Sequence, residues 1–224
     1  GATPYEVQTP RPSWAEQDVE VVWAGMVRAV RDALHAAAVD PGRVQALSFS
    51  GAMHSLLALD ADGQPLTPAL IWADARSAGH ARRLRAEADA AALYRRTGCP
   101  IHAMYPFAKL RWLRHEQPEV FAAARAFLSI KDYLLYRLTG RLFTDYAIAS
   151  STGCLDLRNL RWDPDALALA GVAKGQLPEL RPPETRIEGG LRPEAAAALG
   201  VPGDVTVVLG GSDGALANLG AGAV

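Results

Sequence analysis

Two short apolar runs, one near each end of the chain, constrain the fold more than any other feature of the sequence. Val44 to Phe49 and Val205 to Leu209 consist mostly of aliphatic and aromatic residues, and small turn-forming residues follow each of them. Runs of this length and character are typical of buried strands. Because a buried strand needs neighbours, we expect the two to pair in one sheet. The sequence therefore predicts an α/β fold in which a mostly helical insertion separates two strand-containing ends.

Amphipathic and capping patterns predict helices through much of the remaining chain. Ser13 to Asp18 offer capping residues ahead of a helix whose apolar stripe runs from Val22 to Leu34. Ser77 to Arg96 is predicted to be one long helical region, whereas Thr3 to Val7 alternates apolar and polar residues and is predicted to be a strand. Further helices are expected near 107–115, 118–124, 132–138, 163–169, 193–199 and 215–219, and further strands near 55–59, 70–73 and 126–130.

The composition narrows the classes of partner. The chain has 224 residues and a formal net charge of -1, so it lacks the basic character that nucleic-acid binding favours. No apolar run approaches the roughly 18 residues that span a bilayer, and Gly1 to Pro12 lack the basic start and apolar stretch of a signal peptide. Cys99 and Cys154 are too few for a disulfide framework and are expected to be reduced. We therefore expect a cytoplasmic protein without a nucleic-acid or membrane partner.

The strongest local candidate for chemistry follows the second apolar run. In the stretch Gly210 to Gly214, an acidic residue, Asp213, stands where a buried strand gives way to a helix. Glycines at such a point allow a sharp turn and the close approach of a ligand, and acids placed there are common in the active sites of α/β proteins. The alternative is that Asp213 caps the next helix, and spacing alone favours the cap.

Two further segments carry residues suited to binding a polyhydroxylated ligand. Met53 and His54 lie in a turn between two predicted strands, where an imidazole can hydrogen-bond to hydroxyl groups. Trp72, Asp74 and Arg76 combine a flat apolar face with bidentate hydrogen-bonding groups, as sugar sites do. Taken singly, each is better explained as a core or surface residue. The same holds for His102, Lys131, Asp132 and Asp145.

The order and spacing of these segments, rather than any one of them, point to a family. They resemble the FGGY carbohydrate kinases, and the gluconate kinase branch of that family most closely. The resemblance runs through nearly the whole chain, and the matching segments follow one another in the family's order. They are Ser13 to Asp18, Phe49 to Ser55, Pro65 to Ser77, Arg96 to His102, Asp145 to Gly153 and Gly211 to Gly214. Many motifs in register are more specific than a single motif.

The resemblance implies an actin-like, RNase H-like fold of two domains, with a sugar and ATP with Mg²⁺ meeting between them. Residues 1–224 would form the N-terminal, sugar-binding domain, and the family's first strand and its C-terminal ATP-binding domain would lie outside them. Met53 and His54 match the pair that contacts the sugar, and Asp213 matches the catalytic base. The further candidates are Trp72, Asp74, Arg76 and His102 for the substrate and Gly211 and Gly214 for the ATP side.

The reaction that the resemblance implies is phosphorylation of a sugar or sugar acid at a terminal hydroxyl. Ala52 and Gly214 stand where xylulose kinases usually carry Gln and an Asn or Gln, which favours D-gluconate as the substrate. Its carboxylate would need a cationic or polar partner, for which Arg76, His102 and Lys131 are the candidates. The alternatives are xylulose or another sugar or polyol as the substrate, and a non-catalytic sugar-binding module.

A different class of function is also considered. The RNase H-like fold hosts two-metal nucleases, and four acidic residues could then be metal ligands, namely Asp60, Asp74, Asp145 and Asp213. The near-neutral charge argues against a nuclease, because nucleic-acid binding needs a cationic surface. We therefore expect a small-molecule partner and no metal ligands within the chain. A homodimer is the one protein assembly considered.

Overall fold

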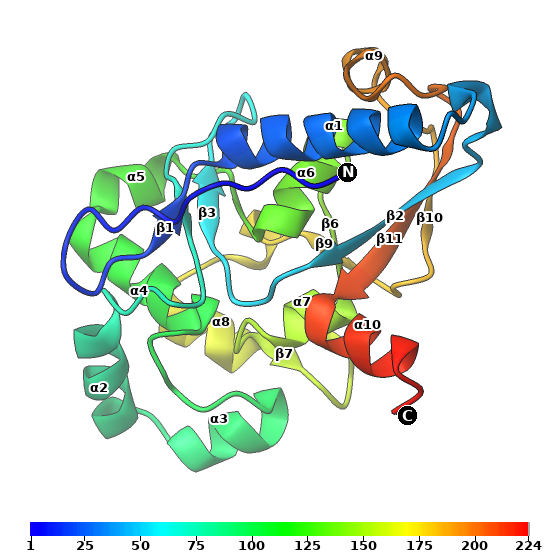
Figure 1. Ribbon diagram of the computed structural model, residues 1–224. Helices are drawn as coiled ribbons and strands as arrows, with labels where there is room; N and C mark the ends of the chain where they lie inside the picture. The colour runs from blue at the N-terminus through cyan, green and yellow to red at the C-terminus, as the bar shows by residue number, and fades with distance from the viewer. Residues whose placement is uncertain (224) are drawn as a thin grey trace.

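The computed structural model describes residues 1–223, and the two apolar runs lie side by side in it (Figure 1). Strand β2 (Ala46–Gly51) pairs in parallel with β11 (Thr206–Ser212), and β10 (Arg186–Ile187) pairs antiparallel with the other edge of β11. The predicted pairing of the two ends of the chain is thereby confirmed. Because β2 and β11 run in the same direction, both strands end at the same edge of the sheet.

A bulge in β11 sets where these two strands end. The register with β2 shifts at this point, and Gly210 has a left-handed φ of 70°. A Cβ atom on Gly210 would lie 2.0 Å from the carbonyl oxygen of Phe49, so only glycine lets the two backbones approach this closely. Beyond the bulge Ser212 pairs with Gly51, which brings the turn after β2 level with the start of helix α10 (Asp213–Gly220).

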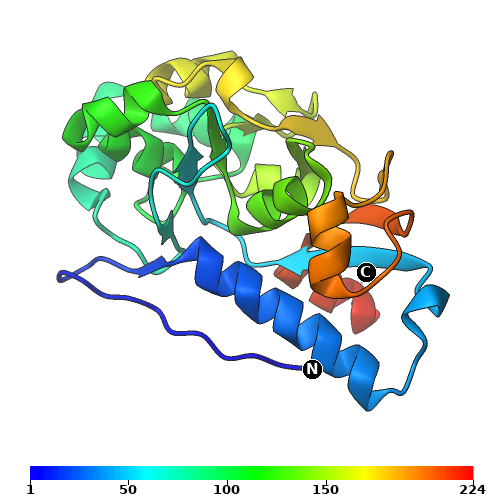
Figure 2. The same ribbon diagram turned by 90° about the horizontal axis from the view of Figure 1, so that it is seen from above.

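Helix α1 (Val19–Ala36) lies along this sheet, as its predicted apolar stripe requires (Figure 2). The helix begins after Asp18, whose carboxylate accepts a hydrogen bond from the backbone N–H of Glu20. The side chains of its stripe that pack against the buried sheet residues Val207 and Leu209 and their neighbours are Trp23, Met26, Val27, Val30 and Leu34.

The prediction of a strand at Thr3 to Val7 is wrong. This stretch runs along α1 (Figure 2) and joins no sheet within the described residues. The side chains of Thr3 and Tyr5 lie beside Gly25. An extended chain has a period of two whether or not it joins a sheet, and here Tyr5 and Val7 stay exposed. An isolated bridge between Gln8 and Glu16 follows this stretch.

The insertion between β2 and β11 is mostly helical, as expected. Its helices are α2 (Ala78–Glu87), α3 (Ala90–Thr97), α4 (Pro106–Glu116), α5 (Pro118–Ala123), α6 (Ile130–Thr139), α7 (Tyr146–Ser150), α8 (Pro164–Ala170) and α9 (Pro193–Leu199). Its strand pairs are β3 (Leu57–Leu59) with β5 (Ala126–Leu128), β6 (Phe143–Asp145) with β9 (Glu179–Arg181), and β7 (Leu155–Asp156) with β8 (Arg161–Trp162). Strand β4 (Ala69–Leu70) pairs with β1 (Glu16–Gln17), and short 3₁₀ turns lie at Pro41–Arg43 and Lys174–Gln176.

Two predictions for the insertion need correction. The single helix expected from Ser77 to Arg96 is divided, because the carboxylate of Asp89 accepts the N–H of Ala92 and caps a new helix. The strand expected near 70–73 ends at Leu70 instead, and the residues after it form a loop. Strands β8, β9 and β10 were not predicted, since each is two or three residues long and lacks an apolar run of its own.

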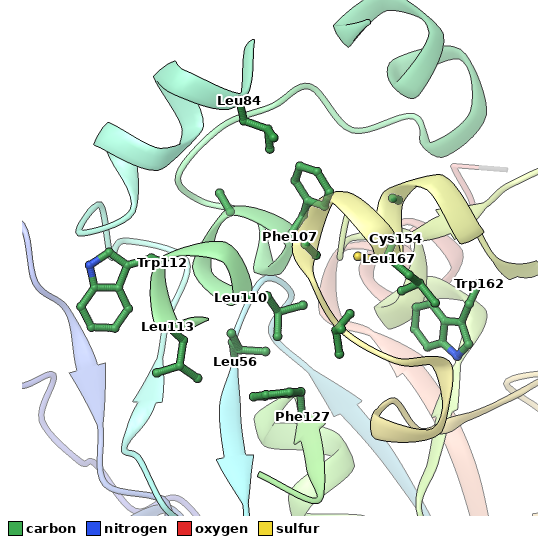
Figure 3. Packing of buried hydrophobic residues seen from close by; sticks show 14 of the residues in the cluster. Leu56, Leu84, Phe107, Leu110, Trp112, Leu113, Phe127, Cys154, Trp162 and Leu167 are labelled. Atoms are coloured by element: carbon green, nitrogen blue, oxygen red, sulfur yellow. The ribbon is translucent and has the colours of Figure 1, made fainter. Parts of the chain in front are cut away.

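Helix α4 lies at the centre of the main apolar core (Figure 3). Phe107, Leu110 and Leu113 on α4 are almost fully buried, and they share this cluster with Leu56 and Trp162. Such packing gives α4 a fixed position relative to the segment that follows β2. Among the described residues, no helix has both the length and the apolar character needed to cross a membrane.

Candidate functional site

Three loops meet beside the ends of β2 and β11, and we call them the loop cluster. They are the turn 51–55 between β2 and β3, the loop 71–77 between β4 and α2, and the loop 98–105 between α3 and α4. The imidazole of His54 makes an edge-to-face contact with Tyr105, with the ring centroids 4.9 Å apart. The hydroxyl of Ser77 donates to the carbonyl of Ala103 over 3.1 Å. These contacts bring together segments that lie far apart in the sequence.

His54 is held in a specific tautomer. Its Nδ1 lies 2.9 Å from the carbonyl oxygen of Ser151, and because a carbonyl can only accept, Nδ1 carries the hydrogen. Burial lowers the pKa of His54, and the charge of Lys109 lowers it too, whereas the Ser151 hydrogen bond and the Asp213 carboxylate act in the opposite direction. The ring is therefore neutral near pH 7, and Nε2 can accept a hydrogen bond from a ligand hydroxyl.

His54 also has an unusual backbone conformation, with a left-handed φ of 69°. A non-glycine residue in this region is strained, and such strain is common where a site needs a side chain in one direction. The preceding residue, Met53, is half-buried, and its Cε would lie 3.6 Å from a Cβ atom on Gly214. The Met53–His54 turn and the start of α10 are therefore neighbours, as the resemblance to the kinases implied.

Asp213 is the first residue of α10, but it does not cap that helix. The N-cap is Ser212, whose hydroxyl accepts the N–H of Ala215 over 3.4 Å. The interpretation of Asp213 as a helix cap is therefore wrong. Its side chain is exposed, accepts the N–H of the adjacent Gly214 over 2.8 Å, and forms no ion pair with any described residue. An exposed carboxylate at the first turn of a helix, beside Met53 and His54, is available to a ligand.

The two glycines predicted for the ATP side differ in their surroundings. Gly211 is buried inside β11, and a Cβ atom there would only touch the side chain of Leu216 at 3.7 Å. Gly214 is half-buried in the first turn of α10, where a side chain would meet Met53. A residue larger than glycine at 214 would thus enter the space between Met53 and the helix.

The loop 71–77 carries three predicted substrate-binding residues, of which Trp72 is exposed whereas the side chains of Asp74 and Arg76 are buried. Trp72 is 58% exposed, so its flat face is free to contact a ligand. Asp74 is buried, where it accepts the N–H of Ala15 over 2.7 Å and pairs with Arg76 over 2.8 Å. The Arg76 guanidinium also pairs with Glu16 and lies over the ring of Trp14. The ion pair therefore ties the loop to residues 15–16.

Two of the three candidate partners for a substrate carboxylate are already used within the protein. Arg76 is enclosed in the ion pairs described above, and its side chain is 3% exposed. Lys131 lies 2.7 Å from Asp145, and both side chains are almost fully buried. His102 is exposed, and its Nδ1 accepts the N–H of Met104 over 3.1 Å, which leaves Nε2 free. His102 is thus the one candidate of the three whose side chain faces solvent.

The metal cluster of a two-metal nuclease is not assembled. Asp145 caps α7 and pairs with Lys131, Asp74 is enclosed with Arg76, and Asp60 accepts backbone N–H groups of its own turn. No group of three or more His, Cys, Asp or Glu residues in the part of the chain that the structure describes could hold a metal ion. The four carboxylates considered for this class serve separate purposes.

The structure adds a residue that the sequence did not suggest. Lys109 on α4 is fully buried, and its ammonium donates to the carbonyl oxygens of His54, Leu70 and Ile71. The available signal was a lysine in a stretch, 106–113, whose other residues are apolar except for Arg111. A lysine at such a position is buried only when its nitrogen has partners, and those partners come from distant loops.

A small cavity of about 30 Å³ lies behind His54. Asp132 and Thr144 line it, and in each of them one buried side-chain oxygen lacks a partner among the described residues. Burial raises the pKa of Asp132 to about 6, although Lys131 and the hydrogen bonds with Ser129 favour the charged form. The rest of the lining is mostly apolar, and the cavity has room for about one water molecule beside these oxygens.

Comparisons with known proteins show what the chain is similar to. Residues 1–220 match a family model described as the N-terminal domain of the FGGY family of carbohydrate kinases. The chain is 37% identical to the gluconokinase of Bacillus subtilis, over 98% of this chain and 42% of that protein. It is 34% identical to the xylulose kinase of Escherichia coli, over 97% of this chain and 44% of that protein. The chain thus spans less than half the length of these curated relatives.

Solved structures show the same likeness. The gluconate kinase from Lactobacillus acidophilus matches with a TM-score of 0.93 and 34% identity, over 99% of this chain and 44% of that one. The xylulose kinase from Rhodospirillum rubrum matches with a TM-score of 0.94 and 30% identity, over 99% of this chain and 45% of that one. The predicted α/β fold of the actin-like class is thereby confirmed.

Proposed function

This chain belongs to the FGGY family of carbohydrate kinases, and we propose that it supplies the sugar site and the catalytic base for phosphorylating D-gluconate at its terminal hydroxyl. The observation that carries this proposal is the position of Asp213. Its carboxylate is exposed, the cap of α10 is provided by Ser212, and the Met53–His54 turn lies against the same helix start. A carboxylate in that position can orient a hydroxyl group and accept its proton.

In the proposed reaction, the terminal hydroxyl oxygen of the sugar forms a bond to the γ-phosphorus as the bond from that phosphorus to ADP breaks. The hydroxyl proton passes to Asp213. Because this transfer has a loose transition state, positioning and charge neutralisation contribute most of the rate, and an ordinary carboxylate suffices as the base. Nε2 of His54 would accept a hydrogen bond from a second hydroxyl of the sugar, and the exposed face of Trp72 would contact the carbon chain of the sugar.

ATP with Mg²⁺ would supply the transferred phosphoryl group and neutralise its charge. The residues described here fit one side of such a ligand, because α10 begins at Asp213 and the N-terminus of a helix favours anions. Mg²⁺ in phosphoryl transfer is held largely by phosphate oxygens with one or two carboxylates.

Gluconate differs from neutral sugars by its carboxylate, and we propose His102 as the residue that meets it. Arg76 and Lys131 are enclosed in ion pairs, whereas His102 is exposed on a loop that Tyr105 and Ala103 join to the rest of the loop cluster. A His102→Gln variant keeps a polar side chain but cannot become positively charged. Its KM should rise roughly fivefold or more for gluconate and stay unchanged for xylulose. An equal change for both substrates would contradict this role.

The proposed activity is tested by ADP release from the full-length protein over a panel of gluconate, xylulose, glycerol and related sugars. Gluconate should give the highest kcat/KM. Faster turnover of xylulose or glycerol would indicate another substrate of the same family. Xylulose and glycerol kinases are 34% and 32% identical to this chain. Calorimetric binding of gluconate without turnover would indicate a sugar-binding module. The division into domains, the cytoplasmic location and the homodimer stay predictions.

A further inference from the structure

Lys109 makes contacts that extend beyond its own helix. Its nitrogen lies 2.6 Å from the carbonyl oxygen of His54, 2.6 Å from that of Ile71 and 3.2 Å from that of Leu70. The first acceptor belongs to the turn after β2, and the other two lie at the end of β4, directly before Trp72. One buried nitrogen therefore joins the two segments that carry His54 and Trp72.

The three acceptors depend on Lys109 to different degrees. The carbonyl of Leu70 also accepts the N–H of Leu56, and that of Ile71 also accepts the N–H of Asp74. For the carbonyl of His54, Lys109 is the one donor found among the described residues. Because His54 has a left-handed φ of 69°, a charged donor on its carbonyl is well placed to hold this strained conformation.

We infer that Lys109 is a positioning residue for sugar binding, because its ammonium holds the His54 turn and the Trp72 loop in fixed relation. This inference rests on the proposed sugar-kinase function of the site. Helix α4 is well suited to the task, since its own side chains are buried in the main core and Tyr105, directly before it, contacts the His54 ring. The position of Lys109 is thus set by the rigid part of the fold.

The protonation state of Lys109 decides how many of these bonds can exist. An ammonium has three N–H groups for three carbonyls, whereas a neutral amine has two. Burial lowers the pKa of Lys109 to about 7, while Asp74 favours the charged form and Arg76 disfavours it. His54, the other titratable group near it, is held neutral by burial. Lys109 is thus mostly charged below its pKa of about 7 and loses its proton as the pH rises above that value.

The test compares Lys109→Met with Lys131→Met in the full-length protein. Both lysines are buried, and both variants lose stability, but the Lys131 ammonium pairs with Asp145 and donates to none of the three carbonyls that Lys109 holds. Lys109→Met should raise the KM for the sugar roughly tenfold or more, with a much smaller change in the KM for ATP. Lys131→Met should show no such selective change. Unchanged sugar KM in folded Lys109→Met would overturn the inference.

A second measurement keeps the inference testable if Lys109→Met does not fold. In the wild type, the KM for the sugar should rise from about pH 6 to about pH 9 as the ammonium loses its proton, and the KM for ATP should not follow it. Lys109→Arg keeps a charge that does not titrate in this range, so its sugar KM should be independent of pH. A wild-type sugar KM that stays constant over this range would contradict the inference.

The failure of this inference and the failure of the proposed function give different results. If the wild type turns over no sugar of the panel, the proposed function fails before any variant is compared. If the wild type phosphorylates a sugar but Lys109→Met and Lys131→Met have the same sugar KM, the kinase assignment stands and the role of Lys109 is refuted.

Discussion

The imidazole of His54 donates from Nδ1 to the carbonyl oxygen of Ser151, 2.9 Å away, and this bond decides which ring nitrogen can accept a ligand hydrogen. Two variants separate this role from the backbone strain at the same residue. His54→Ala and His54→Asn should both raise the KM for the sugar, since both lose Nε2. Asparagine tolerates the left-handed φ of 69° better than alanine does, so unfolding titrations should show His54→Asn to be more stable by about 1 kcal/mol. Equal stability of the two variants would contradict the claim that the backbone of residue 54 is strained.

Variants of Asp213 and Ser212 should separate a loss of catalysis from a loss of helix capping. Asp213→Asn should lower kcat by about a thousandfold with little change in stability, because a general base is lost and the cap of α10 is kept. Ser212→Ala should lower the stability by about 1 kcal/mol, because the hydroxyl that accepts the N–H of Ala215 is removed. The two measurements are steady-state kinetics and chemical unfolding. Retention of full activity by Asp213→Asn would refute its role as the base.

Asp132 should make stability depend on pH in a specific direction. Burial raises its pKa from 3.8 to about 6, so between these values the folded state binds more protons than the unfolded state. Stability therefore falls as the pH rises through this window. Lowering the pH from about 7 to about 5 should stabilise the wild type by about 1 kcal/mol relative to Asp132→Asn, which has no proton to bind. Parallel stability curves for the two proteins would contradict the shift.

Both cysteines should resist thiol reagents in the folded protein. Burial raises the pKa of Cys99 to about 11 and that of Cys154 to about 12, so almost no reactive thiolate is present near pH 8. A chromogenic disulfide reagent should react with neither thiol under native conditions and with both after unfolding in denaturant. Rapid reaction of one thiol in the native protein would show that its segment opens readily.

The sequence predicted the sheet and most helices because their signals are local. The two end strands are apolar runs, and most of the helices have capping or apolar patterns within their own segments. The failures came where one local pattern is compatible with two structures. Thr3 to Val7 alternates like a strand but lies along α1, and Asp89, within a helix-forming stretch, starts a new helix. A period of two and a lone Asp are each compatible with more than one structure.

The sequence predicted the candidate site only in part, because a local pattern does not show which residues of distant segments meet. Met53 and His54 were proposed as site residues from motif order, and the structure places them beside the start of α10. Their contact with a sugar stays a prediction. The enclosure of Arg76 and Lys131 could not be predicted, because their partners lie on other segments and a charged side chain in a sequence looks exposed. Lys109 was missed because its three acceptors are backbone carbonyls, which leave no pattern of side chains to recognise.

The glycine at the bulge of β11 has a consequence for how function is mapped genetically. Any side chain at Gly210 would collide with the backbone at Phe49 and push β11 away from β2, which would displace Asp213 from the Met53–His54 turn. In a saturation screen scored by growth, position 210 would therefore appear as intolerant as Asp213, although its requirement is steric. Scoring protein abundance alongside growth would distinguish the two, because Asp213 variants should accumulate normally and Gly210 variants should not.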